Sequence, residues 1–297
     1  MSEKRILPTS DLGFRKAFST AGKEYILKGF LQDVFDADKM KKKIVSVRVG
    51  NPYNVIDVNQ LSDDERKALL LNTELDIYCV VDDHCEVAIE MQVKDVKYIE
   101  ERIFNNSALK YIANYDRIFF KDGELKNSGQ KKKQSRYSGF IPIVSLNIFH
   151  EHHFLASQNA LHFFRLYDKK DEKYTLNPDR YTEIYFELNK DDANLSENLQ
   201  AWKHFMLTGE ARQGAPSYIK EASEMLKISN LTTEERKQHD IYKRNLQKML
   251  SREAYVFDQG IEQAKLETAK RFLAMGLSIE DVAKGADLDY NIVYKLA

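Results

Sequence analysis

Two carboxylates and one carboxamide stand where they could handle a metal ion or a phosphate group. Asp76 lies at the start of the apolar stretch 75–81, and Glu90 and Gln92 lie in the stretch 85–93. Carboxylate oxygens are the ligands that hard divalent cations prefer. If the two acids converge on a covered surface, they are costly to bury unless they hold a cation.

The two stretches predict the strands of a β-hairpin, because apolar residues alternate with other residues along each. The apolar rows are Leu75, Ile77, Cys79 and Val81 in the first strand and Cys85, Val87, Ile89, Met91 and Val93 in the second. Both rows must face one core, and this favours a turn with an odd number of residues, such as Asp82-Asp83-His84. In that register Asp76 lies opposite Glu90, and Gln92 follows on the same face. The hairpin by itself also fits an ordinary antiparallel sheet whose polar face is solvated.

The elements around the hairpin predict a sheet between helices, an α/β fold with a helical C-terminal extension. Helical spacing covers 9–20, 23–35 and 97–120, and strand patterns cover 44–49, 140–149, 161–167 and 182–188. The run 140–149 is almost entirely apolar, as in a strand covered on both faces. Helices follow from residue 193, among them 232–250, 253–275 and two short ones in 276–297. We therefore expect one domain over 1–192 and a helical region over 193–297.

Composition limits the classes of protein. The net charge of −1 gives no global attraction to nucleic acid, so binding to DNA requires a local basic patch. No stretch approaches the roughly eighteen apolar residues of a membrane span, which predicts a protein without membrane partners. The two cysteines, Cys79 and Cys85, both fall in the core rows of the hairpin. Two buried thiols indicate a reducing compartment, and we expect a cytoplasmic protein.

Several motifs in order along the chain resemble one branch of the PD-(D/E)XK nucleases. Asp76 followed by Glu90-Met91-Gln92 is similar to the signature in its E-x-Q form. The other matching segments are Asp11-Leu12-Gly13-Phe14-Arg15-Lys16-Ala17-Phe18, Glu101-Arg102, Pro142–Ile148, Glu187-Leu188-Asn189-Lys190 and Trp202. Together they resemble the transposase-associated PD-(D/E)XK proteins, also called recombination-promoting nucleases. The likeness runs over most of the chain.

This resemblance implies a restriction-endonuclease-like core, with a mixed central sheet flanked by helices and a site on the hairpin. By analogy, Asp76, Glu90 and the carbonyl of Met91 would bind magnesium or manganese, and Asp11 would add an acid from the first helix. Gln92 stands where the wider family often has lysine. A lysine brings positive charge to the reacting phosphate, whereas a glutamine can only orient water.

Basic residues offer candidate contacts to the DNA backbone. The loop after the long helix carries Lys131, Lys132, Lys133 and Arg136, and the resemblance adds Arg102. Such contacts would hold phosphates without reading sequence. A solvated loop explains the lysines equally well, and Arg102 could instead pair with a nearby acid such as Asp95, Glu100 or Glu101.

The C-terminal helices suggest assembly rather than chemistry. Residues at heptad-like spacing, Ala254, Phe257, Ile261, Ala264 and Thr268, favour either a dimerisation helix or packing on the same chain. The tail 278–296 is typical of a degenerate helix-turn-helix, because its second helix carries a single base.

The sequence thus leads to a metal-dependent DNA endonuclease, in which a homodimer could form through the C-terminal helices. The alternative is an inactive DNA-binding or protein-interaction module on the same fold.

Overall fold

The computed structural model describes residues 3–38, 43–50, 77–92, 97–121, 124–125, 141–171 and 180–297. Side chains are described for all of these except 110–121, 124–125, 249–250 and 253. Two compact units divide the chain between Thr232 and Thr233. Among the described residues, no helix has the length and the apolar character that crossing a membrane requires.

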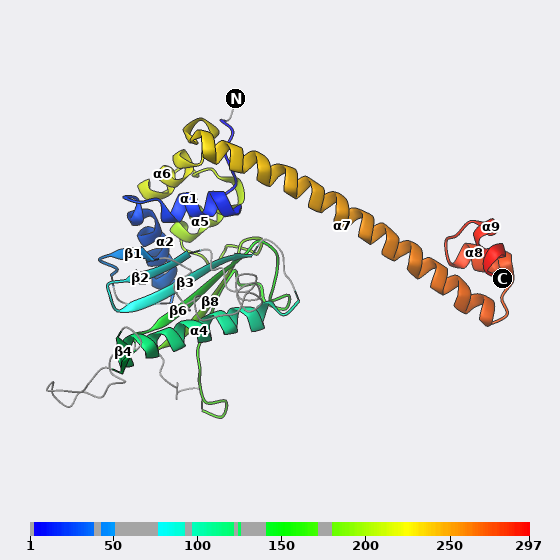
Figure 1. The fold of residues 1–297 in the computed structure, drawn as a ribbon, viewed down its shortest axis with the longest axis horizontal. Helices are drawn as coiled ribbons and strands as arrows, with labels where there is room; N and C mark the ends of the chain where they lie inside the picture. Colours follow the sequence, from blue (N-terminus) through cyan, green and yellow to red (C-terminus); the bar gives the residue numbers. More distant parts are fainter. Residues whose placement is uncertain are drawn as a thin grey trace. The chain divides into compact units, whose positions relative to one another are not determined.

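The first unit contains runs of helices and runs of strands in its described residues (Figure 1). Its helices are α1 (Asp11–Ser19), α2 (Glu24–Ala37), α4 (Ile99–Phe119), α5 (Glu197–Thr208), α6 (Ser217–Met225) and the short 3₁₀ turn η3 (Ile228–Asn230). Its strands are β1 (Val47–Gly50), β2 (Ile77–Val81), β3 (Cys85–Gln92), β4 (Phe120–Lys121), β5 (Glu124–Leu125), β6 (Ile143–Phe149), β7 (Leu161–Phe164) and β8 (Tyr181–Glu187). Helix α1 begins where the Ser10 hydroxyl accepts the Gly13 amide, as an N-cap does.

The main sheet is mixed, and its six described strands lie in the order β1-β2-β3-β6-β8-β7. The three central strands β3, β6 and β8 are parallel, and the remaining pairings are antiparallel. Every residue of β6 is buried, which confirms the prediction of a strand covered on both faces. Because parallel strands end at one edge, Gln92, Phe149 and Glu187 lie side by side there.

Helices cover both faces of this sheet, α1, α2, α5 and α6 on one side and α4 on the other (Figure 1). The first group packs on the apolar row of the hairpin, and Phe14, Phe30 and Trp202 share one core with Ile77 and Ile89. On the other side, Ile99 and Ile103 of α4 pack against Phe149 and Tyr185. The predicted α/β fold with a mixed sheet between helices is therefore confirmed.

A buried aspartate joins helices that are distant in sequence. The carboxylate of Asp33 in α2 accepts hydrogen bonds from Trp202 Nε1 (2.9 Å), Tyr218 Oη (2.7 Å) and Asn198 Nδ2 (2.8 Å). Trp202 and Asn198 lie in α5, and Tyr218 lies in α6. Both helices therefore belong to the same core as the sheet. The first compact unit accordingly continues to Thr232, beyond the boundary expected after residue 192.

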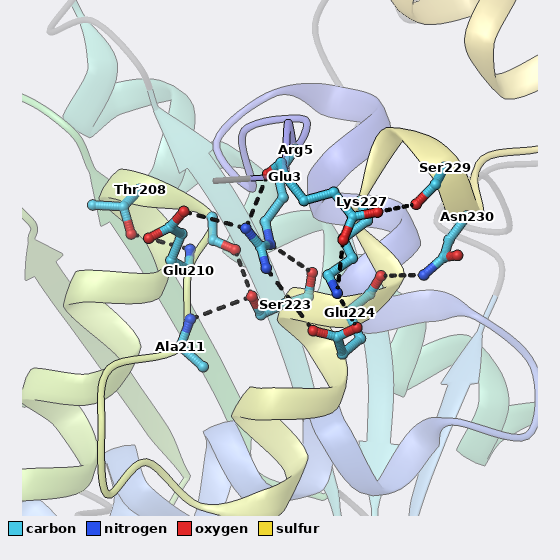
Figure 2. A network of polar contacts seen from close by, with 11 residues as sticks. Glu3, Arg5, Thr208, Glu210, Ala211, Ser223, Glu224, Lys227, Ser229 and Asn230 are labelled. Atoms are coloured by element: carbon cyan, nitrogen blue, oxygen red, sulfur yellow. Dashed lines mark hydrogen bonds and ion pairs between the residues drawn. The ribbon is translucent and has the colours of Figure 1, made fainter. Parts of the chain in front are cut away.

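The N-terminal segment is fastened to the end of α6 by the polar network in Figure 2. Arg5 and Lys227 form an antiparallel backbone bridge, and Arg5 Nε donates to the Ser223 carbonyl at 3.3 Å. Lys227 Nζ pairs with Glu3 at 3.0 Å and with Glu224 at 2.5 Å. The charges of Arg5, Lys227 and the glutamates in this network thus compensate one another.

The second unit begins with α7 (Thr233–Ala274), which continues into α8 (Ile279–Gly285) and α9 (Tyr290–Leu296). One helix of 42 residues replaces the two predicted over 232–250 and 253–275. The sequence between them contains neither glycine nor proline, so the backbone has no reason to break there. A small core of Ala269, Val282 and Val293 joins the three helices.

A candidate metal centre on the central strand

The hairpin has the register that the apolar rows predicted. Val81 pairs with Cys85 and Ile77 with Ile89, so the turn consists of Asp82, Asp83 and His84. Asp82 and Asp83 have positive φ angles of 51° and 54°, which Asp tolerates better than most residues. Asp82 Oδ1 also accepts the amides of Val45 and Ser46 and thereby holds β1 to the turn. Asp76, whose predicted partner is Glu90, lies outside the described residues.

Glu90 and Gln92 lie beneath a helix and not in water. Glu90 is 6% exposed and Gln92 is 8% exposed. Both point to the face that α4 covers, because their partners in the register, Asn147 and Phe149, share the face of Tyr185. A solvated polar face is therefore the wrong reading of this hairpin.

Three donors surround the carboxylate of Glu90. Gln92 Nε2 donates to Oε1 at 2.8 Å, and Arg102 Nη2 forms an ion pair with the same oxygen at 2.5 Å. Asn106 Nδ2 donates to Oε2 at 3.1 Å. Arg102 and Asn106 stand four residues apart on α4, so both reach the sheet from one side of that helix. These contacts fix the orientation of both carboxylate oxygens.

The electrostatic balance at Glu90 has two opposing parts. Burial raises the pKa of the Glu90 carboxyl above its ordinary value, because the charged form loses its hydration. The positive charge of Arg102 and the hydrogen bonds from Asn106, Arg102 and Gln92 oppose this rise. A cation beside the buried Glu90 carboxylate thus interacts with it more favourably than it would with a carboxylate at the surface.

The backbone of β3 supports the predicted role of the Met91 carbonyl. The Glu86 amide donates to the Pro142 carbonyl, and the His150 amide donates to the Gln92 carbonyl. Since backbone groups alternate sides along a strand, the even-numbered residues of β3 bond to β6. The Met91 carbonyl therefore points to the opposite side, toward β2 and the predicted position of Asp76.

Two buried polar atoms beside Glu90 have no hydrogen-bond partner among the described residues. They are Arg102 Nε and Asn106 Oδ1. Such atoms are rare in folded proteins, because an unpaired buried polar group carries its full desolvation cost. The amide oxygen of Asn106 lies on the group that donates to Glu90, so it adds a hard oxygen donor next to the carboxylate. The Glu90 carboxylate and this amide oxygen fit an oxygen-liganded divalent cation, whereas the Arg102 N–H can only donate to an anion or to water.

The structure extends and corrects the predicted set of residues. Asn106 was missed, although its spacing from Arg102 on one helix could have pointed to it. Arg102 pairs with neither Glu100 nor Glu101 in the described contacts, but with Glu90, twelve residues away, and Asp95 lies outside the described residues. Sequence proximity was the wrong guide because α4 turns this arginine toward the sheet.

The other predicted residues are not joined to Glu90. Asp11 is exposed at the start of α1, and its carboxylate accepts from Arg15 Nε at 2.9 Å. Helix α1 packs on the apolar side of the sheet, whereas Glu90 faces α4. The predicted phosphate contacts Lys131, Lys132, Lys133 and Arg136 lie outside the described residues, so their prediction remains open.

The histidine-rich segment after β6 has a packing role in the described structure. The ring of His153 stacks on Phe149 and Tyr185, with centroids 4.8 and 5.8 Å apart, and its Nε2 lies 3.0 Å from Glu100. Within the described part of the chain, no group of three or more His, Cys, Asp or Glu residues has a metal-binding arrangement. A complete metal site at Glu90 would therefore need Asp76.

Comparison with known proteins identifies the family. A family model described as PD-(D/E)XK nuclease family transposase matches residues 8–265, which is most of the chain. No curated protein and no solved structure matches the chain. The matched range contains the complete hairpin and α4, which carry Glu90, Gln92, Arg102 and Asn106. The chain therefore belongs to the PD-(D/E)XK nuclease family transposases.

Proposed function

We propose that this protein is a metal-dependent DNA endonuclease that hydrolyses phosphodiester bonds and acts in DNA recombination. The observation that carries the proposal is the buried Glu90 carboxylate, with Gln92 on the same face and Asp76 predicted opposite it. A bound magnesium or manganese ion would stabilise negative charge on the phosphate and acidify a water molecule.

Each residue of the site has a proposed role. Asp76, Glu90 and the Met91 carbonyl would hold the ion, and Gln92 would orient the attacking water. Asp11 lies on α1, which packs on the opposite side of the sheet from Glu90, so it is not given a role at the metal. Arg102 and Asn106 would hold Glu90 in place, and the lysine-rich loop around residues 131–136 would contact phosphates.

Nicking of supercoiled plasmid in the presence of magnesium or manganese tests the proposal. We expect nicking by the unaltered protein and its loss in Asp76→Ala and in Glu90→Ala. A useful control is Asp83→Ala, because Asp83 lies in the turn of the same hairpin and pairs with the exposed Arg48. Equal nicking by all four proteins would contradict the assignment.

An inactive DNA-binding or interaction module remains the second candidate, and one observation favours it. Arg102 and two further hydrogen-bond donors, Gln92 and Asn106, already compensate Glu90 without a metal ion. Calorimetric titration with manganese separates the two functions. Heat of binding that Glu90→Ala abolishes supports the nuclease, and no uptake at millimolar concentration supports the module.

A homodimer through the C-terminal helices is also part of the proposal. Phe257 and Ile261 on α7 are 68% and 41% exposed within the described chain, which disfavours packing on the same chain. Light scattering on the full chain and on a chain ending at residue 250 tests this. A change from dimer to monomer on truncation is expected, and an unchanged mass contradicts it.

A further inference from the structure

The first part of helix α7 concentrates positive charge. Residues 236–252 contain six lysines and arginines and one acid, Asp240. The bases are Arg236, Lys237, Lys243, Arg244, Lys248 and Arg252, and all six are exposed. A chain with a net charge of −1 thus carries a strongly basic segment on one exposed helix.

Four of these bases form a row along one side of the helix. The steps from Lys237 to Arg244, Lys248 and Arg252 are seven, four and four residues, which are the spacings that return to one helix face. At a rise of about 1.5 Å per residue, the row extends over roughly 22 Å. We call Lys237, Arg244, Lys248 and Arg252 the basic row.

The basic row does not stabilise its own helix. Like charges four residues apart repel each other, as Arg244 does with Lys248 and Lys248 with Arg252. Among the described side chains, no ion pair joins these four residues to a carboxylate, and Arg244 Nε donates to the Asp240 carbonyl at 3.3 Å. The row therefore costs the isolated protein some stability, which an anionic partner would recover.

The remainder of α7 has the opposite character. Residues 253–274 contain four acids and three bases, and one of these bases, Lys265, pairs with Asp287 at 2.5 Å. A solvated helix usually mixes both signs along its length. Here the positive charge is confined to one segment, which indicates a ligand for that segment.

Polar residues beside the row indicate what this ligand is. Gln247 and Ser251 flank the row on one edge and Asn245 on the other, all three are exposed, and Ile241 is a large apolar side chain within the row rather than along its borders. A helix that lies in a lipid surface places large apolar residues along the borders of its basic face. Amide and hydroxyl groups instead hydrogen-bond to phosphate and sugar oxygens.

We propose that the basic row binds the sugar-phosphate backbone of duplex DNA and so retains the substrate of the proposed nuclease. The choice of DNA as the anion rests on that proposed function. Along one DNA strand phosphates follow at about 3.4 Å of helix axis, so a row of this length spans several of them. Binding of this kind is independent of base sequence and strongly dependent on salt.

Fluorescence anisotropy with a labelled duplex of mixed sequence tests the row. The full chain is titrated in the presence of a chelator, at salt concentrations from about 50 to about 200 mM. The test variant is Lys237→Gln/Lys248→Gln/Arg252→Gln. The control variant, Lys270→Gln/Arg271→Gln/Lys284→Gln, removes the same number of lysines and arginines from exposed positions of the same unit. Circular dichroism checks that both retain their helices, since glutamine has a similar helix propensity.

We expect the test variant to bind on the order of tenfold more weakly at intermediate salt, with a log–log salt slope smaller by roughly three. The control should keep the affinity and the slope of the unaltered protein. Equal effects of the two variants, or none of either, would overturn the inference. Stronger retention on phosphatidylserine vesicles than on DNA, lost in the test variant alone, would also overturn it.

The two proposals fail in different ways. Binding is measured without metal, so a protein that nicks no DNA can still show binding through the basic row. Conversely, metal-dependent nicking with unchanged DNA binding by the test variant would leave the nuclease intact and refute the row.

Discussion

The guanidinium of Arg102 forms an ion pair with the buried carboxylate of Glu90, with Nη2 and Oε1 2.5 Å apart. The arginine side chain is 37% exposed and the glutamate side chain 7%. The guanidinium of Arg102 can therefore move toward water, whereas the carboxylate of Glu90 cannot. A divalent ion would compensate the same charge, so Arg102 and the metal perform overlapping electrostatic tasks.

Replacing Arg102 by methionine should destabilise the protein and make it dependent on metal. The change leaves Glu90 buried without its cation, and we expect a loss of about 1–3 kcal/mol, below the range for a fully buried pair because Arg102 is partly exposed. Manganese should raise the melting temperature of Arg102→Met more than that of the unaltered protein. Thermal unfolding with and without manganese measures both effects.

The matched control for that change is Arg48→Met. Arg48 pairs with Asp83 at 2.8 Å, but both side chains are more than 70% exposed. An exposed pair contributes about 0–1 kcal/mol, so this variant should melt near the unaltered protein and respond equally to manganese. A larger loss at Arg48 than at Arg102 would refute the role given to burial.

Replacing Asn106 by aspartate should lower the stability of the metal-free protein and raise its affinity for manganese. Asn106 Nδ2 donates to Glu90 Oε2, and an aspartate there puts a second negative charge against the buried glutamate. We expect Asn106→Asp to be less stable in chelator and to bind manganese more tightly. Calorimetry and thermal unfolding give the two quantities.

Asn106→Ala serves as the comparison at the same position. It removes one hydrogen bond, which typically contributes about 1 kcal/mol, and it removes the unpaired amide oxygen. Its manganese affinity should fall below that of the unaltered protein. If the alanine and aspartate variants bind manganese equally, Asn106 does not face the metal.

Replacing Lys190 alone should destabilise the protein far more than replacing Lys190 and Glu187 together. Lys190 Nζ lies 2.7 Å from Glu187 Oε2, and the two side chains are 2% and 0% exposed. Removal of the lysine leaves the buried carboxylate with only His162 Nε2, at 3.3 Å, and backbone amides beside it, so Lys190→Met should cost about 3–5 kcal/mol. Glu187 Oε1 also accepts the amides of His153 and Phe154, so the pair anchors the loop after β6.

The double variant Lys190→Met/Glu187→Gln should recover much of that loss. A neutral glutamine can still accept the two amides with its carbonyl oxygen but leaves no buried charge. Urea unfolding of the unaltered protein, of Lys190→Met, of Glu187→Gln and of the double variant gives the coupling between the two sites. Additive losses in the double variant would show that the ion pair does not act as a unit.

The thiol of Cys85 should be unreactive in the folded protein. Burial raises the pKa of Cys85 to about 12 from 9.0, with a further contribution from the charge of Glu86. Since the folded state holds this proton at a pH where the unfolded chain releases it, stability should fall as the pH rises above about 9.

Alkylation by iodoacetamide checks the state of this thiol. At pH 8 the folded protein should react much more slowly than the protein in urea, and its rate should keep rising with pH without a plateau near 9. The variant Cys79→Ala isolates Cys85, because Cys79 is the other thiol of the chain. Rapid reaction of the folded variant at neutral pH would show that packing against the core does not protect the half-buried Cys85.

Local patterns in the sequence were sufficient for much of the fold. Alternation fixed the register of the hairpin and its turn of three residues, because a one-residue shift exposes an entire apolar row. Helical spacing located α1, α2 and α4 to within a few residues. The break expected near residue 250 was wrong, because neither glycine nor proline stands there and α7 runs through it.

What the sequence by itself determined is which residues share a face: Glu90 with Gln92, and the apolar row Ile77, Cys79 and Val81. That follows from the two-residue period of a strand, which needs no knowledge of the rest of the chain. Only the tertiary structure decided that α4 covers the face of Glu90 and that Arg102 and Asn106 meet it there. Burial and ion pairing depend on which helix packs on which face, and contacts between distant residues leave no period in the sequence.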